Sequence, residues 1–345
     1  MAVTAYDRPL EPFDAPEPEV APGYALLEVI TCGVCFTDVK TATGQMPYSA
    51  SLALPHIPGH EIFGRVVRSE PPGLIPEGTL GTVYQYWPCG RCAACRRGDE
   101  PLCDALEGWI GFIHHGGFRE RLAVRADRLI RIPPGIDPVL AAPMSCALGT
   151  AYRSVITRGG ARAGSSVAVI GLGGVGIHAA QMARAAGATT VGFDVHPPTL
   201  GSARSLGIEA DRGDDAGAEE RHRSRFGGFD VVVDTVGHAD TFAKAVRLVR
   251  TAGRIVGVGY APDSSFAIAS PRLVLGEIEV VGSRYAHRDD LERAVAMVEA
   301  DAVRPIVGMV RPLEAVNEIF EALKAGAVVG RAVLDVAGVS ETRGP

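Results

Sequence analysis

Apolar residues in the middle of the chain gather in short runs that alternate with helical patterns. Five runs have the length and the β-branched content of buried strands. They are residues 166–170, 189–193, 230–234, 253–258 and 279–283. Between them, 177–186 is rich in alanine and 241–249 has apolar residues at helical spacing, so both predict helices. Strands that alternate with helices form βαβ units, and this region therefore predicts a parallel sheet.

The first 150 residues have a different pattern. Short apolar segments at 24–31, 62–67 and 80–84 are separated by many Gly and Pro residues, and a short helix is expected from about Asp38. Several short strands separated by Gly and Pro residues predict a β-rich, barrel-like domain.

The remaining segments complete the predicted order of elements. Helical patterns at 289–299 and 314–324 precede a strand at 331–335, and the highly charged stretch 214–225 predicts a solvated helix or loop. A chain of 345 residues is too long for one ordinary core, so we expect two domains.

Composition narrows the class of protein. Hydrophobic residues make up 47% and charged residues 21%, which is ordinary for a soluble globular protein. The net charge of −6 and the lack of a dense Lys/Arg block argue against nucleic-acid binding. No apolar run approaches the roughly 20 residues needed to span a bilayer. The first residues lack the basic and apolar regions of a signal peptide, so we expect a cytoplasmic protein without membrane partners.

A glycine-rich loop follows the strand 166–170 and opens the helix at 177. The loop reads Gly-Leu-Gly-Gly-Val-Gly, and its strand–loop–helix context is the one that dinucleotide-binding loops require. Asp194 ends the next strand, where a carboxylate accepts hydrogen bonds from both ribose hydroxyls and repels a 2′-phosphate. The residues expected to bind the cofactor are Gly171, Gly173, Gly174, Val175, Gly176 and Asp194. The pattern favours NAD over NADP.

Cysteine usage indicates metal binding. The seven cysteines all lie at or before residue 146, and an odd count in a cytoplasmic chain argues for metal or catalytic roles over a disulfide framework. Four of them lie within fifteen residues. They are Cys89, Cys92, Cys95 and Cys103. Four thiolates fit a closed tetrahedral zinc site, although an iron–sulfur cluster or reduced, unliganded thiols are alternatives that the spacing leaves open.

A second candidate site combines residues from three separated segments. Cys35, His60 and Cys146 offer two thiolates and one imidazole, the ligand set of a catalytic zinc that keeps a fourth position open. Each residue alone has an ordinary structural role as its alternative, such as a small buried thiol or a hydrogen-bonded core histidine. The dinucleotide loop in the same chain favours the metal site.

Seven motifs in one order resemble those of a known family. They are Cys-Gly-Val-Cys-Phe-Thr-Asp (32–38), Gly-His-Glu (59–61), the four-cysteine segment, Gly-Gly-Phe (116–118), Cys-x3-Thr-x-Tyr (146–152), the glycine loop, and Gly-Arg-Ala-Val-Leu (330–334). Together they resemble the zinc-dependent alcohol dehydrogenases of the medium-chain dehydrogenase/reductase family. The resemblance implies an α/β fold with a GroES-like catalytic domain in residues 1–150 and 286–345. A Rossmann domain, a doubly wound parallel sheet that binds NAD, would occupy 151–285.

The resemblance also implies residue roles. Cys35, His60 and Cys146 would bind the catalytic zinc and the other four cysteines a structural zinc, two per chain. Asp38 would orient His60, and Glu61 would lie near the metal. Thr37 would hydrogen-bond the substrate hydroxyl and begin a proton relay, and Arg331 would reach the cofactor pyrophosphate.

Two positions depart from the family pattern. Phe36 stands where relatives often carry His or Arg, which removes a possible pyrophosphate contact. Lys40 stands where many relatives end the relay with His. Lys40 either passes a proton, which requires a lowered pKa, or pairs with a cofactor phosphate or ribose.

The expected function is NAD-dependent oxidation of a primary or secondary alcohol to an aldehyde or ketone, or the reverse. Aromatic residues near the metal segments, at 36, 84, 86, 87, 109 and 112, favour an apolar or aryl alcohol. The alternatives are a cyclitol, sugar or amino-alcohol dehydrogenase, and a metal- and nucleotide-binding protein with a structural or regulatory role. As in relatives, the strand at 279–283 would pair with its mate in a homodimer, or within a homotetramer.

Overall fold

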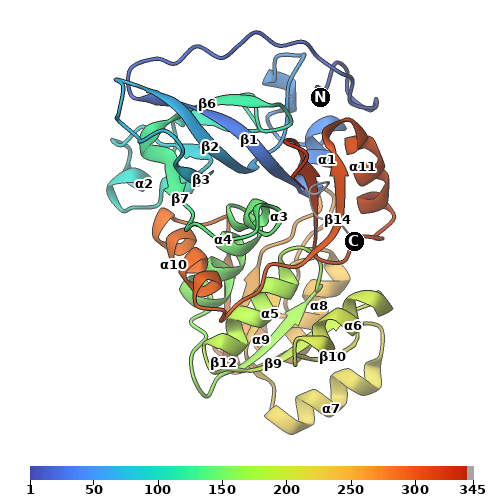
Figure 1. The fold of residues 1–345 in the computed structure, drawn as a ribbon. Helices are drawn as coiled ribbons and strands as arrows, with labels where there is room; N and C mark the ends of the chain where they lie inside the picture. Colours follow the sequence, from blue (N-terminus) through green and yellow to red (C-terminus); the bar gives the residue numbers. More distant parts are fainter. Residues whose placement is uncertain (340–345) are drawn as a thin grey trace. The chain divides into compact units, whose positions relative to one another are not determined.

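A computed structural model describes residues 1–339, and these divide into two compact units (Figure 1). The first unit consists of residues 1–146 and the described residues from Val307 onward. The second is Ala147–Ile306. It contains the whole stretch 151–285 that the sequence assigns to nucleotide binding, and it continues through a further helix, α10 (Arg288–Glu299).

The first unit is built on one mostly antiparallel sheet. Among the described residues its order is β14-β15-β1-β2-β3-β7, with β6 paired to β1. The strands are β1 (Tyr24–Val34), β2 (Glu61–Glu70), β3 (Leu80–Val83), β6 (Arg121–Arg125), β7 (Leu129–Arg131), β14 (Val307–Pro312) and β15 (Arg331–Asp335). The predicted strands at 24–31, 62–67, 80–84 and 331–335 are therefore confirmed. The GroES-like architecture implied by the motifs agrees with this sheet.

Strand β1 is longer than its local sequence predicts. The sequence predicted a strand that ends at Thr31, but the strand continues to Val34 because Thr31–Val34 pair with β15 on one side and Thr31–Gly33 pair with β2 on the other. The partner strand β2 lies in the N-terminal part of the first unit's sequence, and β15 lies in its C-terminal part. The extension carries the chain directly to Cys35, where helix α1 (Phe36–Ala42) begins.

Short elements surround this sheet. A two-stranded ribbon pairs β4 (Tyr86–Trp87) with β5 (Gly108–Trp109). The helices are α1, α2 (Ala93–Arg96), α3 (Pro138–Ala141) and α11 (Val316–Lys324). Buried residues of α11, including Val316 and Ile319, join the core formed by Leu27, Val29 and Ile62 of the sheet. The C-terminal helix thereby closes one side of the first unit's core.

The second unit contains the predicted parallel sheet. Its strand order is β10-β9-β8-β11-β12-β13, and every neighbouring pair is parallel. The strands are β8 (Ser166–Ile170), β9 (Thr189–Asp194), β10 (Glu209–Arg212), β11 (Phe229–Asp234), β12 (Val249–Gly257) and β13 (Glu279–Gly282). The first strand lies beside the fourth at the centre, which is the order of a Rossmann sheet with its switch point between β8 and β11.

Helices connect these strands. They are α4 (Ala147–Tyr152), α5 (Gly176–Ala185), α6 (Pro197–Ser205), α7 (Ala216–Phe226), α8 (Ala239–Leu248), α9 (Ser270–Leu275) and α10. The charged stretch 214–225 is mostly helix α7, whose first turn is capped by the Asp215 side chain and whose end is the left-handed Gly227. Strand β10 and helix α6 were not predicted. Among the described strands, β10 pairs only with β9 and is therefore an edge strand, which tolerates charged residues. Those charged residues are the reason that its sequence did not predict a strand.

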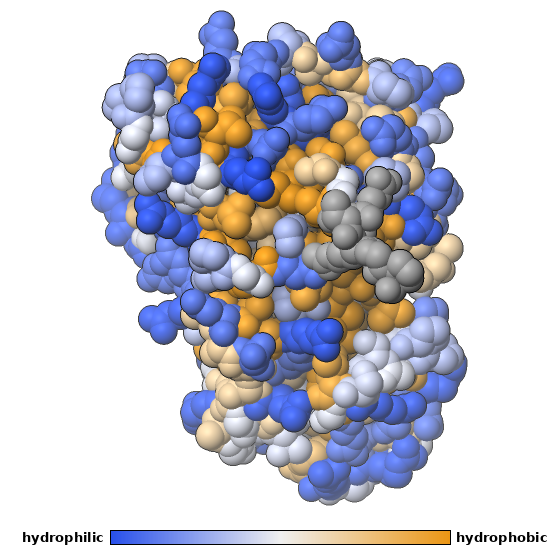
Figure 2. Space-filling view, in the orientation of Figure 1, coloured by the Kyte–Doolittle hydropathy of each residue, from blue (hydrophilic) through white to orange (hydrophobic). Residues whose placement is uncertain are grey.

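Figure 2 shows hydrophilic residues over much of the face in view, interspersed with hydrophobic ones. Among the described residues, no single helix is long and apolar enough to cross a membrane. One bent pair of segments, Pro138–Met144 and Ala147–Arg158, reaches that length and apolar content only when the two are taken together.

Candidate active site

The structure brings together the three residues expected to bind a catalytic metal. Ligand atoms of Cys35, His60, Glu61 and Cys146 all lie within 4.8 Å of one another. All four residues are at least nine-tenths buried. Cys35 follows β1 and His60 precedes β2, and the antiparallel register that pairs Gly33 with Glu61 places them side by side. The pairing of β1 with β2 thus brings Cys35 and His60 together, and Cys146 joins them from a separate segment.

Asp38 orients the imidazole of His60. Its Oδ1 lies 3.0 Å from His60 Nδ1, and its Oδ2 accepts a hydrogen bond of 2.8 Å from the backbone N–H of Cys35. Burial disfavours the charge on His60, but the buried Asp38 carboxylate outweighs it and raises the pKa of His60 well above its ordinary value. A metal at Nε2 would be stabilised by the same carboxylate, because a carboxylate on Nδ1–H makes imidazole a better ligand.

Of the two thiols, Cys35 is the one prepared for a cation, because the hydrogen bond with Cys35 and burial raise the pKa of Cys146 well above its ordinary value. A hydrogen bond with Cys146 and the nearby charge of Arg331 outweigh burial and lower the pKa of Cys35 well below its ordinary value. The Thr37 hydroxyl lies 3.4 Å from Cys35 Sγ and is joined to it by a hydrogen bond. The thiolate form that a metal requires is therefore favoured at Cys35 in the folded chain.

Glu61 and Arg331 form a buried ion pair beside the thiols. Arg331 Nη2 lies 3.0 Å from Glu61 Oε1 and 3.8 Å from Cys146 Sγ. No residue in the described part of the chain donates a hydrogen bond to either oxygen of Glu61 despite this ion pair, and burial raises the pKa of Glu61 to about 7 although Arg331 opposes the shift. A buried carboxylate without donors next to two thiols is costly. A divalent cation would relieve that cost, so these residues fit a metal.

Thr37 and Lys40 both lie on α1, three residues apart and hence on neighbouring positions of one helix face. Lys40 is half-buried, and its Nζ lies 5.9 Å from the centre of the exposed Phe36 ring. Burial lowers the pKa of Lys40, and Cys35 partly opposes the shift. The direction is the one that a proton-transferring lysine needs.

An aromatic group packs against His60. The Phe112 ring centre lies 4.6 Å from that of His60, and Trp109 lies 4.2 Å from Phe112. Tyr86 stacks on Trp109 at 5.3 Å, and Tyr48 meets Trp109 edge-on at 5.2 Å. The sequence pointed to Tyr86, Trp109 and Phe112 but missed Tyr48, because nothing in its local sequence marks it as a neighbour of the ribbon β4–β5.

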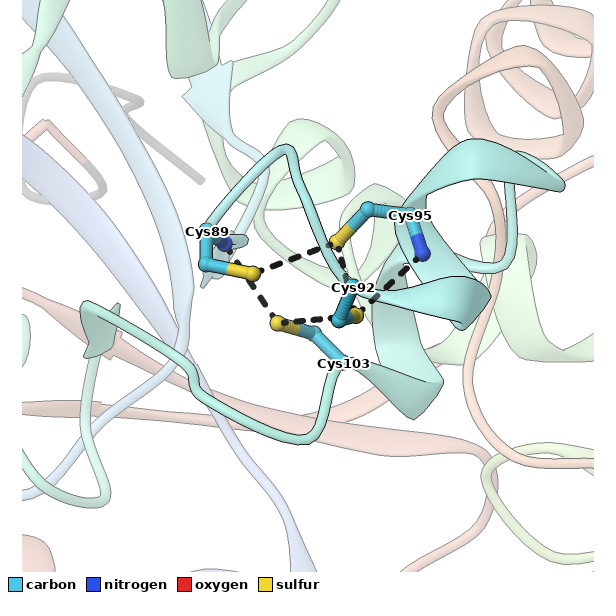
Figure 3. A group of neighbouring side chains, drawn as sticks. All are labelled: Cys89, Cys92, Cys95 and Cys103. Carbon is cyan, nitrogen blue, oxygen red and sulfur yellow. Dashed lines mark hydrogen bonds between the residues drawn. The ribbon is translucent and has the colours of Figure 1, made fainter.

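The other four cysteines gather in one group, with their sulfur atoms turned toward a common centre (Figure 3). Sγ of Cys92 lies 3.4 Å from that of Cys95 and 3.9 Å from that of Cys103, and Cys89 is 3.9 Å from Cys95. Sulfurs at tetrahedral corners, with bonds of about 2.3 Å to zinc, are about 3.8 Å apart. The backbone N–H groups of Cys95 and Asp104 lower the pKa of Cys92 to about 6. The geometry fits one metal ion.

The glycine loop has the backbone that the sequence predicts. Gly171 has a φ of +82° at the turn. A Cβ on Gly176 would lie 1.7 Å from the Gly171 oxygen, whereas a Cβ on Gly173 would meet nothing within 4 Å. The first and third positions therefore need glycine for the turn and for close packing, and the middle one faces open space.

Asp194 lies against this loop. Its Oδ2 accepts a hydrogen bond of 2.6 Å from the Leu172 backbone N–H, and its Oδ1 accepts one of 2.9 Å from the N–H of His196. The carboxylate is thus fixed beside the glycine loop in the second unit. Arg331, by contrast, lies in the first unit with Glu61 and Cys146, and its contact with a pyrophosphate stays a prediction.

Comparison with known proteins agrees with these observations. Residues 21–134 match a family model described as the alcohol dehydrogenase GroES-like domain, and residues 174–300 match one described as a zinc-binding dehydrogenase. An alcohol dehydrogenase of Geobacillus stearothermophilus is 33% identical over 340 residues, which cover 97% of this chain and 98% of the relative.

Solved structures are similar over nearly the whole chain. An NAD-dependent alcohol dehydrogenase superposes with a TM-score of 0.90 at 27% identity, covering 97% of this chain and 99% of the other. A putative zinc-binding dehydrogenase from Sinorhizobium meliloti, bound to NADP, has a TM-score of 0.84 at 27% identity and covers 92% and 94%.

Proposed function

The chain belongs to the zinc-type alcohol dehydrogenases of the medium-chain dehydrogenase/reductase family, and on that premise we propose that it transfers hydride between an alcohol and NAD. The alcohol would be primary or secondary, and the product an aldehyde or ketone. The observation that carries the proposal is the buried group of Cys35, His60, Glu61 and Cys146, within 4.8 Å of one another.

In this proposal Cys35, His60 and Cys146 hold the catalytic zinc. A bound zinc would supply Lewis acidity at the alcohol oxygen, and a bound nicotinamide would supply the hydride acceptor. Asp38 accepts the Nδ1–H of His60, so that Nε2 keeps its lone pair for the metal. Arg331 offsets part of the negative charge of Glu61 and Cys146, which it contacts. Glu61 would lie beside the metal without being one of its three proposed ligands.

Cys89, Cys92, Cys95 and Cys103 would hold a second, structural zinc. Four thiols leave no coordination position for substrate, which suits a structural site. The chain would then carry two zinc ions.

The second unit would bind the cofactor through Gly171, Gly173, Gly174, Val175, Gly176 and Asp194. The N–H groups at the start of α5 favour a pyrophosphate, and the Asp194 carboxylate favours an unsubstituted ribose. By the family resemblance, Arg331 would contribute a charge to the pyrophosphate.

Thr37 would hydrogen-bond the substrate hydroxyl and begin a proton relay, and Lys40 would take part in one of two ways. Kinetic and binding measurements on Lys40→Met separate them. A relay role predicts a changed pH profile of hydride transfer with an unchanged NADH dissociation constant. A cofactor-pairing role predicts weaker NADH binding with an unchanged pH profile.

The aromatic group next to His60 favours apolar or aryl alcohols. Phe112 and Tyr86 are almost completely buried, and stacked rings offer area but few hydrogen-bond partners for a polyol. A cyclitol, sugar or amino-alcohol dehydrogenase is the alternative.

Strand β13 is an edge strand with the half-exposed Val280, and its unpaired edge supports a homodimer, or a homotetramer built from such dimers. A cytoplasmic location is part of the proposal, because cysteines that serve as metal ligands suit a reducing compartment.

A panel of alcohols with NAD, combined with metal analysis, tests the proposed function. Benzyl alcohol should be oxidised faster than ethanol or an inositol, and a strong chelator should abolish turnover. Cys146→Ser should lose one of two zinc ions and nearly all activity. Cys32→Ser is the matched control, since Cys32 is buried but lies outside both cysteine groups, and it should keep both ions. A protein that binds zinc and NADH yet turns over no alcohol or carbonyl would favour a regulatory role.

A further inference from the structure

We propose that Arg212 and Asp214 are a second determinant of which dinucleotide the chain binds. In this view Asp214 occupies the guanidinium of Arg212, which would otherwise receive the 2′-phosphate of NADP. The inference rests on the proposed dinucleotide site and concerns residues of the second unit alone.

Strand pairing places Arg212 next to Asp194. Strands β9 and β10 are parallel, and their register pairs Arg212 with Asp194 directly. Neighbouring strands are about 4.8 Å apart, and side chains at paired positions leave the sheet on the same face. The side chain of Arg212 therefore starts beside the carboxylate that faces the ribose.

The segment after Arg212 is held against Asp194 from two sides. The Gly213 N–H donates a hydrogen bond of 2.8 Å to the Asp194 backbone oxygen. Nζ of Lys244 donates a hydrogen bond of 3.0 Å to the Gly213 oxygen, and the Lys244 side chain is almost fully buried. The position of Asp214 relative to the ribose site is thus set by the fold.

Arg212 is engaged by Asp214 through two parallel hydrogen bonds. Nε lies 2.8 Å from Oδ1, and Nη2 lies 2.5 Å from Oδ2. A guanidinium fork of this kind is also the group that binds a phosphate in a bidentate way. The carboxylate of Asp214 therefore occupies the donors that a 2′-phosphate would use.

The carboxylates of Asp194 and Asp214 should oppose binding of a 2′-phosphate to different extents. Asp194 is held by two backbone N–H groups and repels a 2′-phosphate directly. The Arg212–Asp214 pair is half-exposed, and exposed pairs are weak because water and salt screen them. Removal of Asp214 alone should hence change little while Asp194 remains. Once Asp194 has been replaced by an uncharged residue, the affinity for the phosphate should depend on whether Asp214 still engages Arg212. A structural relative bound to NADP indicates that this fold accommodates the phosphate.

Dissociation constants of NADH and NADPH, measured by nucleotide fluorescence without substrate, test the inference. The proteins are wild type, Asp194→Ser, Asp214→Asn, the double variant, and the double variant with Arg212→Gln. Asp194→Asn, which keeps an amide oxygen as acceptor, replaces Asp194→Ser if the serine variant does not fold. Glu209→Gln is the matched control, because Glu209 lies on the same strand as Arg212 and forms an exposed pair with Arg225. It should leave both constants unchanged.

We expect wild type to prefer NADH and Asp214→Asn to bind NADPH within about twofold of wild type. The double variant should bind NADPH about tenfold more tightly than the Asp194 variant alone, and Arg212→Gln should remove that gain. The inference is overturned if the double variant gains nothing over the single one, or if the gain survives Arg212→Gln. Wild-type protein that binds neither nucleotide would instead refute the proposed function, and the inference with it.

Discussion

Asp38 orients the ring of His60, one of the three proposed zinc ligands, although it contacts no substrate in the proposed mechanism. Its two oxygens serve the His60 ring, the Cys35 N–H and the Gly59 N–H at the same time. The sequence alone placed Asp38 near His60 only through a family resemblance. The structure shows the physical reason, because a single buried carboxylate ties together the two segments that carry the first two ligands.

Asp38→Asn should therefore weaken metal binding more than it weakens the fold. The amide keeps one acceptor but loses the charge that stabilises a metal-bound imidazole, and such changes typically cost 10- to 100-fold, an order-of-magnitude range, in metal affinity or activity. Competition with a zinc chelator measures the affinity. Thermal unfolding of the zinc-saturated protein is the control. A variant with normal zinc affinity would show that Asp38 only caps α1.

At the scale of elements, the segment 109–118 packs tightly on the backbone that precedes His60. A Cβ on Gly116 would lie 2.0 Å from the Gly59 oxygen and 2.6 Å from the Pro58 oxygen. The N–H of Gly116 donates to the Ile57 oxygen, and the N–H of Gly117 donates to the Gly59 oxygen. The sequence motif Gly-Gly-Phe marked this segment, but only the packing shows that its glycines allow two backbones to approach.

Gly116→Ala should displace the His60 segment. Backbone atoms cannot move aside as a flexible side chain can, so we expect a loss of about 2 kcal/mol or more in unfolding free energy together with lower zinc content. Gly201→Ala is the matched control. Gly201 lies in helix α6, where an added Cβ would meet nothing within 4 Å, and alanine there should stabilise by about 0.5–1 kcal/mol. Equal effects of both substitutions would contradict the packing argument.

Histidines within this segment, and His56 packed against it, are held neutral. Burial lowers the pKa of His56 to about 4, and its Nε2 lies 3.2 Å from the Gly111 oxygen. Burial also lowers the pKa values of His114 and His115. Nδ1 of His115 accepts from the Ile57 N–H at 3.2 Å, which only an unprotonated nitrogen can do.

Acid should therefore destabilise this segment. Between pH 6.5 and pH 4 the unfolded His56 binds a proton that the folded one does not, so stability falls as pH falls through that window. From pH 7 to pH 5 the loss from His56 is about 2 kcal/mol. His56→Gln keeps a donor for Gly111 without titrating, and urea unfolding should show a shallower loss. Between pH 7 and pH 8 the difference in unfolding free energy between His56→Gln and wild type should stay constant. At lower pH, a loss of stability in His56→Gln as steep as that of wild type would refute the assignment to His56.

At the scale of the molecule, the β13 edge of the second unit's sheet has exposed apolar residues on it and shortly before it in the chain. Strand β13 pairs only with β12, and Val280 on it is 44% exposed. Leu275, four residues earlier in the chain than the strand, is 81% exposed. An unpaired strand edge with apolar neighbours is suited to pairing with a second copy.

Val280→Lys should shift the protein toward smaller species. A charge on the edge strand opposes strand pairing between copies, and sedimentation velocity over a range of concentrations measures the change. Leu74→Lys serves as control, because Leu74 is similarly exposed but lies in the first unit outside any strand. An unchanged mass for Val280→Lys would place the interface elsewhere.

The amino-acid sequence by itself determined the type and order of most elements. Periodicity and residue chemistry are local, so strand β8, the glycine loop and helix α5 were predicted within a residue or two. The same holds for the four-cysteine segment, whose ligands lie within one short stretch. The chemistry of each candidate ligand is likewise a property of the residue.

The tertiary structure alone decided how distant segments meet. Arg331 beside Glu61, Tyr48 beside Trp109, and Asp214 with Arg212 beside Asp194 all depend on strand register and packing between separate segments. The local hydrophobic pattern can specify which face of a strand is buried, but it does not specify which distant strand lies beside it. The sequence shows which side chains carry the chemistry. Which of them are neighbours depends on the pairing of β1 with β2 and β15, and of β9 with β10.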